Sequence, residues 1–176
     1  MKTIRAWLGL DAADTAPEFA PLRETLDALD HLEPDQARRL SAFAYLLGRV
    51  AHADQHVSPD ETRAMEALVH EQGQLSGDQA MVVVQLAKAS NLLFGGTANF
   101  LVAREFSALA SYEQKIALMR CLFAVSAADE AISTAEESEI HRIANELRID
   151  HADLIALRVS HQRHLPGMSR RNHRRE

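Results

Sequence analysis

The chain has 176 residues, 47% of them apolar and 25% charged, which is enough for one globular domain with its own core. The formal net charge of the chain is −6. Residues 161–176 hold five arginines and one glutamate and so carry +4, which means that residues 1–160 carry −10. Such an acidic body argues against nucleic acid as the main partner and is compatible with cations. A single cysteine excludes an internal disulfide, and no apolar run reaches the roughly 20 residues of a membrane span, so we expect a cytoplasmic protein.

Helix-start and helix-stop signals recur along the chain, while strand patterns are nearly absent. Proline suits the first turn of a helix at Pro17 and Pro34, whereas Gly73 and the Gly95–Gly96 pair have the character of helix ends. The sequence predicts an all-α, single-domain bundle of about seven to eight helices. The expected helices cover residues 18–30, 34–53, 59–72, 77–93, 98–110, 112–128, 134–147 and 151–163, with a short additional helix near residues 3–9.

The expected organisation has three parts. Residues 1–33 form an N-terminal helical extension, residues 34–160 form the main domain, and residues 161–176 form a basic, mobile tail. The arginines of this tail are compatible with a peripheral contact to anionic lipid, but a solvated terminus is the simpler interpretation.

An internal repeat is the most informative feature of the sequence. A shift of 75 residues aligns VAHADQHVSPDETRAMEAL (50–68) with VSAADEAISTAEESEIHRI (125–143). Both copies contain A-D-x-x-[VI]-S-x-x-E, and the last four residues of this signature form a capping box that starts a helix. The repeat therefore predicts two related helix–turn–helix units.

Four acidic residues occupy equivalent places in the two units: Asp54, Glu61, Asp129 and Glu136. Helical spacing places Asp54 on the apolar stripe that ends at Val50, and it places Asp129 on the stripe that ends at Val125. A buried carboxylate needs a counter-charge or several hydrogen bonds. If the two units pack about a pseudo-twofold axis, the four carboxylates converge on one divalent-metal site.

The residue types constrain the ion. Carboxylate oxygens favour Ca²⁺, Mg²⁺ or Mn²⁺, and the flanking His52 and His56 would also admit Zn²⁺. A metal-free alternative remains open. Each glutamate is explained by its capping box and each aspartate by hydrogen bonds within its turn, which gives a structural or adaptor bundle.

Enzyme and other metal motifs do not fit. An EF-hand loop starting at Asp54 fails because Met65 stands at the twelfth position, and a loop starting at Asp129 has Ile140 there. There is no HExxH, P-loop, GxGxxG or GxSxG motif. A metal-dependent hydrolase would need a general base, for which only His52 or His56 is at hand. We therefore expect a non-catalytic protein, with Cys121 as a buried, inert thiol.

At the stretches LGRVAHADQHVSPDE, FAVSAADEAISTAEE and LRIDHADL the sequence resembles the TerB-like family of tellurite resistance proteins, over about residues 34–160. The resemblance implies a helical bundle that binds a divalent metal through Asp54, Glu61, Asp129 and Glu136 and that acts in stress response through protein partners. The sequence departs from the family where a glycine commonly follows the aspartate, because Gln55 and Glu130 stand there. Related domains are fused to J-domains in co-chaperones, but the HPD tripeptide of a J-domain does not occur here.

Overall fold

The computed structural model describes residues 33–73, 75–128 and 131–161, which form six α-helices and no strand. This confirms the predicted all-α bundle. Apart from residues 33 and 161, the expected N-terminal extension and the basic tail lie outside the described residues. The helices are α3 (Pro34–Ala51), α4 (Pro59–Gly73), α5 (Gly77–Leu109), α6 (Tyr112–Ser126), α7 (Thr134–Leu147) and α8 (His151–Ser160).

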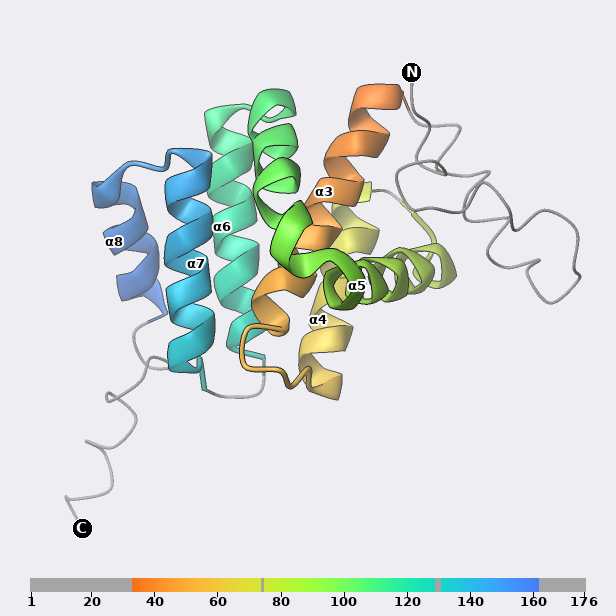
Figure 1. The fold of residues 1–176 in the computed structure, drawn as a ribbon, viewed down its shortest axis with the longest axis horizontal. Helices are drawn as coiled ribbons and strands as arrows, with labels where there is room; N and C mark the ends of the chain where they lie inside the picture. The colour runs from red at the N-terminus through yellow and green to blue at the C-terminus, as the bar shows by residue number, and fades with distance from the viewer. Residues whose placement is uncertain (1–32, 74, 129–130, 162–176) are drawn as a thin grey trace, which may run out of the picture.

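Helix α3 lies at the centre of the bundle and contacts α4, α5, α6 and α7, with its most extensive packing against α5 (Figure 1). Every residue from 40 to 51 is buried. The sequence predicted an apolar stripe along this helix, but a helix surrounded by four others is buried on all sides. Gly48 faces α5, and a Cβ there would stand only 2.9 Å from Nδ2 of Asn91, so the Asn91 side chain would have to shift.

Helix α5 corrects the prediction of two helices over 77–93 and 98–110. It runs without interruption for 33 residues, so Gly95–Gly96 does not end a helix. Glycine costs about 0.5–1 kcal/mol in a helix interior, which packing against neighbouring helices can offset. Figure 1 shows that α5 changes direction partway along its length, as helices do where small residues weaken the regular ladder.

A buried ion cluster joins α3 to α7. Arg49 is only 4% exposed, and its guanidinium bonds to Glu146 through two nitrogens, at 2.6 and 3.0 Å, and to Glu139 through Nε. Arg142 adds a second ion pair to Glu139, at 2.8 Å. Burial alone would lower the pKa of Arg49, but the bonds and charges of Glu146 and Glu139 outweigh it and raise the pKa. The cluster therefore keeps the arginine charged inside the bundle.

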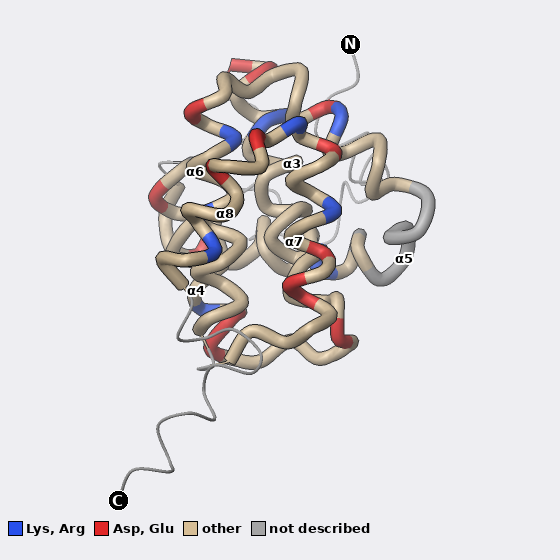
Figure 2. Tube along the Cα trace, turned by 90° about the vertical axis from the view of Figure 1, so that its left-hand side faces the viewer, with Lys and Arg blue, Asp and Glu red and all other residues tan. Residues whose placement is uncertain are grey.

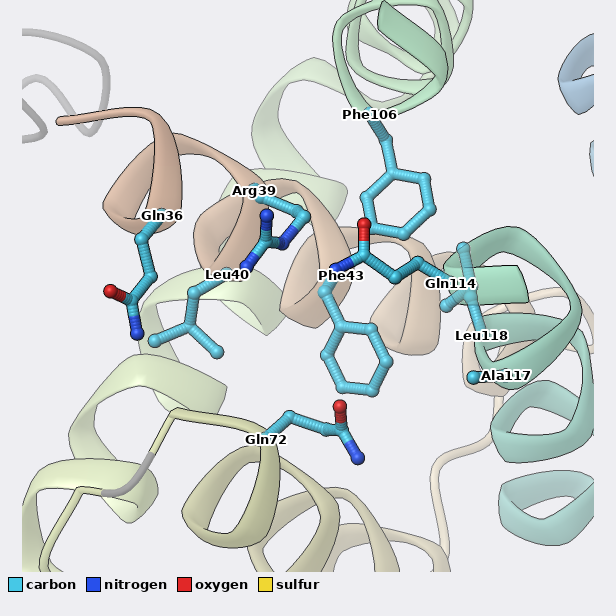
Figure 3. Close-up of a pocket in the computed structure, with 9 residues that line it drawn as sticks. All are labelled: Gln36, Arg39, Leu40, Phe43, Gln72, Phe106, Gln114, Ala117 and Leu118. Atoms are coloured by element: carbon cyan, nitrogen blue, oxygen red, sulfur yellow. The ribbon is translucent and has the colours of Figure 1, made fainter. Parts of the chain in front are cut away.

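A small pocket lies between the first halves of α3 and α6 (Figure 3). Its volume is about 70 Å³, well below the roughly 300 Å³ at which ligand pockets begin. Its walls are apolar and amide-bearing with one arginine, and they contain no acid, histidine or cysteine. The lining residues are Gln36, Arg39, Leu40, Phe43, Gln72, Phe106, Gln114, Ala117 and Leu118. The lining therefore offers no metal-ligating carboxylate, imidazole or thiolate.

None of the described helices, the 33-residue α5 included, combines the length and hydropathy needed to cross a membrane.

Cys121 is buried, and burial together with the charge of Glu71 raises the pKa of its thiol to about 11. Because the thiolate is the reactive form, we expect the native protein to react very slowly with a thiol reagent at pH 8. The same protein unfolded in guanidinium should react at once. Fast labelling of the native protein, followed by absorbance, would show that this face of α6 opens readily.

Candidate metal-binding junctions

The two helix–turn–helix junctions lie at the same end of the bundle. The end of α3 and the start of α4 form the first junction, and the end of α6 and the start of α7 form the second (Figure 1). Figure 2 shows acidic residues at both ends of the bundle, this one included. The pocket is remote from both junctions, because it is lined by the first halves of α3 and α6 and the junctions follow the ends of these helices. The predicted site residues therefore come from segments that share one end of the molecule.

The two helices that enter the junctions end in the same way. The N–H of His52 donates to the carbonyls of Gly48 and Val50 after α3, and the N–H of Ala127 donates to the matching carbonyls of Phe123 and Val125 after α6. The following residues repeat the pattern, since Ala53 donates to Val50 and Ala128 donates to Val125. The backbone hydrogen bonds at the end of α3 are thus equivalent to those at the end of α6. The two-fold repeat of whole helix–turn–helix units stays a prediction.

The helices that leave the junctions start with equivalent capping boxes. The Ser58 hydroxyl accepts from the Glu61 N–H at 3.1 Å, while Oε2 of Glu61 accepts from the Ser58 N–H at 2.7 Å. Ser133 and Glu136 make the same pair of bonds, at 3.1 and 2.8 Å. Both glutamates are only 3% exposed. The capping boxes are therefore confirmed, and each places a carboxylate in the interior near a junction.

Asp54 corrects one expectation. Helix α3 ends at Ala51, three residues earlier, so the helical periodicity does not continue to Asp54 and its side chain is exposed. Its Oδ1 accepts the backbone N–H of His56 at 2.9 Å, as an aspartate does when it stabilises a turn. The prediction that Asp54 lies on a packing face is wrong.

Buried polar atoms without a hydrogen-bond partner are concentrated at the junctions. Three such side-chain atoms are found in the described part of the chain: Nε2 of His52, Oγ of Ser126 and Oε1 of Glu136. His52 follows the last residue of α3, Ser126 ends α6, and Glu136 stands in the first turn of α7. An unpaired buried polar atom is costly, so a water or ion bound beside these atoms would stabilise this end of the bundle.

The histidines differ in their surroundings. Burial lowers the pKa of His52, with a bond to the backbone of Lys88 opposing this effect and the Lys88 charge adding to it. His52 is therefore neutral at pH 7, the form in which imidazole binds a metal. His56 is exposed.

Asp129 lies outside the described residues, as does Glu130. Within the described ranges, His, Cys, Asp and Glu form no group of three or more that would hold a metal ion. Asp54, Glu61 and Glu136 therefore do not make such a group without Asp129, and the four-carboxylate site stays a prediction.

Sequence reasoning missed two features, Ser126 and the cluster around Arg49. Ser126 occupies the position that matches Ala51, and a polar residue at the end of an apolar stripe was the available signal. Arg49 stands alone in the apolar run LSAFAYLLGRVA, and Glu139 and Glu146 share the helix face of Ile143. Charged residues on the apolar face of a predicted helix can be recognised in the sequence. Which charged residue of another helix each of them pairs with cannot.

Gln55 adopts φ 66°, the left-handed region that side chains other than glycine rarely occupy. The TerB-like pattern commonly has glycine at this position, because glycine adopts a positive φ without steric strain. We expect Gln55→Gly to raise the free energy of unfolding by about 0.5–1 kcal/mol, because relief of strain exceeds the added chain entropy. Urea denaturation measures this. As a control, Gln85→Gly at an exposed site inside α5 should lower the free energy of unfolding by about 1 kcal/mol. If both substitutions change the free energy of unfolding by the same amount, the explanation from the backbone conformation of Gln55 is wrong.

Comparison with known proteins identifies the family. The model of the family described as tellurite resistance protein TerB matches residues 39–159, well over half of the chain. No curated protein and no solved structure matches. The matched segment runs from α3 to α8 and includes both junctions. The chain therefore belongs to the TerB family.

Proposed function

We propose that this protein is a non-catalytic, divalent-metal-binding module in which the ion is held at the two junctions. The proposal also assigns it to tellurite resistance or a related stress response, where it acts through protein partners. The family's description supports the cellular process, and the chemistry of the junctions supports the ion.

The observation that carries the proposal is the carboxylate of Glu136. One oxygen caps α7, while the other is buried without a hydrogen-bond partner. An ionised oxygen in that position is unfavourable unless a cation lies beside it. Glu61 supplies a second buried carboxylate at the same end of the bundle, and Asp54 and Asp129 are the proposed remaining ligands.

The donor set determines the class of ion. Carboxylate oxygens at a water-accessible end favour Ca²⁺, Mg²⁺ or Mn²⁺. A neutral His52 would add a nitrogen ligand and extend the range to Zn²⁺. The bound ion would screen the repulsion between carboxylates and fix the two junctions relative to each other, and partner proteins would recognise this ordered end.

A metal-free adaptor bundle is the second candidate, and a specific observation favours it. Each of the three described acids already accepts a backbone N–H: Glu61 from Ser58, Glu136 from Ser133, and Asp54 from His56. These bonds account for the positions of the acids without an ion. The two candidates differ in their response to added metal.

Titration calorimetry of chelator-stripped protein with calcium, magnesium, manganese and zinc salts separates the candidates. The metal-binding module should release or absorb heat with a stoichiometric endpoint for at least one ion, and the double variant Asp54→Ala, Asp129→Ala should lose it. If every titration of the wild-type protein is flat, the metal function is wrong and the adaptor bundle is correct.

A further inference from the structure

We propose that the small pocket between α3 and α6 binds the C-terminal residue of a partner protein. Arg39 and the amide of Gln114 hold the terminal carboxylate, and the apolar floor of the pocket holds a branched aliphatic side chain. The pocket is remote from the two junctions, so this inference stands independently of the proposed metal function.

The lining of the pocket divides into an apolar floor and a polar rim. The floor consists of side chains that are no more than 6% exposed, namely Leu40, Phe43, Phe106 and Leu118. The polar lining residues are half-buried or exposed, and they are Gln36, Arg39, Gln72 and Gln114 (Figure 3). A ligand that fills the pocket therefore needs an apolar group at its inner end and a polar group at its outer end.

Arg39 gives the rim a positive charge. In the described part of the chain its guanidinium forms no ion pair and no hydrogen bond. The neighbouring Arg38 pairs instead with Asp35, at 3.1 Å, and with Glu105, and no acid lines the pocket. A guanidinium with unused donors binds a carboxylate through two parallel hydrogen bonds, so the charge of the rim is complementary to a carboxylate.

Gln114 offers a second donor in a fixed position. Its Oε1 accepts the Ser111 N–H at 2.9 Å in the capping box of α6, which sets the orientation of the amide and leaves its NH2 group to a ligand. Figure 3 shows this side chain extending from α6 across the pocket toward α3. Gln114 also stands in the first turn of α6, where the helix dipole favours an anion.

The volume of the pocket limits how much of a ligand it encloses. About 70 Å³ holds roughly five to seven water-sized groups, at about 10–15 Å³ for each. The side chain and carboxylate of a C-terminal valine or leucine together contain about six or seven non-hydrogen atoms, which matches this capacity. A whole nucleotide or cofactor is too large.

The order of floor and rim favours a C-terminal residue over an internal aspartate or glutamate. An internal acid carries its carboxylate at the tip of the side chain, so insertion would place the charge on the apolar floor, where desolvation is costly. At a C-terminus the carboxylate and the side chain leave the same carbon atom. The side chain then enters the floor while the carboxylate stays at the rim beside Arg39.

Peptide titrations followed by amide NMR signals test the binding. Acetyl-Gly-Gly-Leu with a free carboxylate should shift the signals of residues 36–43 and 114–118 with a Kd of roughly 1 mM, and leave those of residues 53–63 in place. The same peptide with a C-terminal amide should bind roughly 10-fold more weakly, because it lacks the charge. Equal binding of the two peptides, or no shift at about 10 mM peptide, would overturn the proposal.

Two variants with the same net charge of −7 test the role of Arg39. Arg39→Gln and Arg104→Gln each remove one positive charge from the −6 of the chain, and Arg104 is an exposed residue of α5 outside the pocket. Arg39→Gln should lower the affinity for the free-carboxylate peptide roughly 10-fold, and Arg104→Gln should change it less than about 2-fold. Equal affinities in both variants would refute the role of Arg39.

Ala117→Leu tests the floor, because Ala117 lines the pocket and a larger side chain there fills it (Figure 3). This variant should lose the binding of both peptides while Arg39 is intact. Wild-type affinity in Ala117→Leu would place the peptide elsewhere on the surface and overturn the proposal.

Two further probes decide the kind of occupant. 4-Methylpentanoate carries the branched chain and carboxylate of a C-terminal leucine without a peptide, and acetyl-Gly-Glu-Gly amide carries an internal carboxylate. Both should bind roughly 3- to 10-fold more weakly than acetyl-Gly-Gly-Leu. If 4-methylpentanoate binds as tightly, the pocket takes a free aliphatic acid. If the glutamate peptide binds as tightly, the pocket takes an internal acidic side chain. Either result overturns the C-terminal assignment.

Discussion

Arg49→Met is expected to lower the free energy of unfolding by about 3–5 kcal/mol, the range measured when one partner of a buried ion pair is removed. The substitution keeps most of the side-chain volume but leaves the carboxylates of Glu139 and Glu146 without their shared cation. For a domain of this size the melting temperature should fall by roughly 10 °C, as measured by calorimetry or circular dichroism.

Arg38 is the matched control, because it also belongs to α3 and pairs with a glutamate of another helix, Glu105 of α5. Its side chain is 44% exposed, against 3% for Arg49. Arg38→Met should therefore cost less than about 1 kcal/mol. The triple variant Arg49→Met, Glu139→Gln, Glu146→Gln should recover part of the loss, because no buried charge is left unpaired. Equal losses for Arg38→Met and Arg49→Met would refute the role of burial.

The double variant Glu61→Gln, Glu136→Gln is expected to abolish the stabilisation by divalent ions while it preserves the fold. In wild-type protein, an ion at a hundred times its dissociation constant should add about 2.7 kcal/mol of stability, and the variant should gain less than about 0.5 kcal/mol. Glutamine can replace glutamate in these caps, since Gln79 and Gln114 complete the same capping boxes at α5 and α6. Thermal melts with and without metal measure the difference.

The converse substitution, Gln114→Glu, serves as the control. It creates a third serine–glutamate capping box, but this box lies at the start of α6, beside the pocket and away from both junctions. It should leave the metal response unchanged. A metal response that survives in Glu61→Gln, Glu136→Gln would remove both glutamates from the set of ligands. A double variant that melts far below the metal-free wild-type protein would show that the charges are needed for the cap itself.

The local features of the fold were predictable because short-range physics determines them. The boxes Ser58/Glu61 and Ser133/Glu136 each depend on four consecutive residues, and both form as expected. The Gly95–Gly96 pair misled the prediction for the opposite reason. Its local preference amounts to only about 0.5–1 kcal/mol per glycine, and α5 continues through it.

The all-α class, the starts of the six described helices and the acidic residues at two similar turns follow from local sequence patterns. Three features depend on the packing of distant helices: residues 40–51 of α3 are buried on all sides, Arg49 pairs with Glu139 and Glu146, and polar atoms of His52, Ser126 and Glu136 are buried without partners. A capping box or an apolar period is encoded within a few neighbouring residues. The desolvation of a charge depends on which distant helix covers it, and only the packed bundle specifies that.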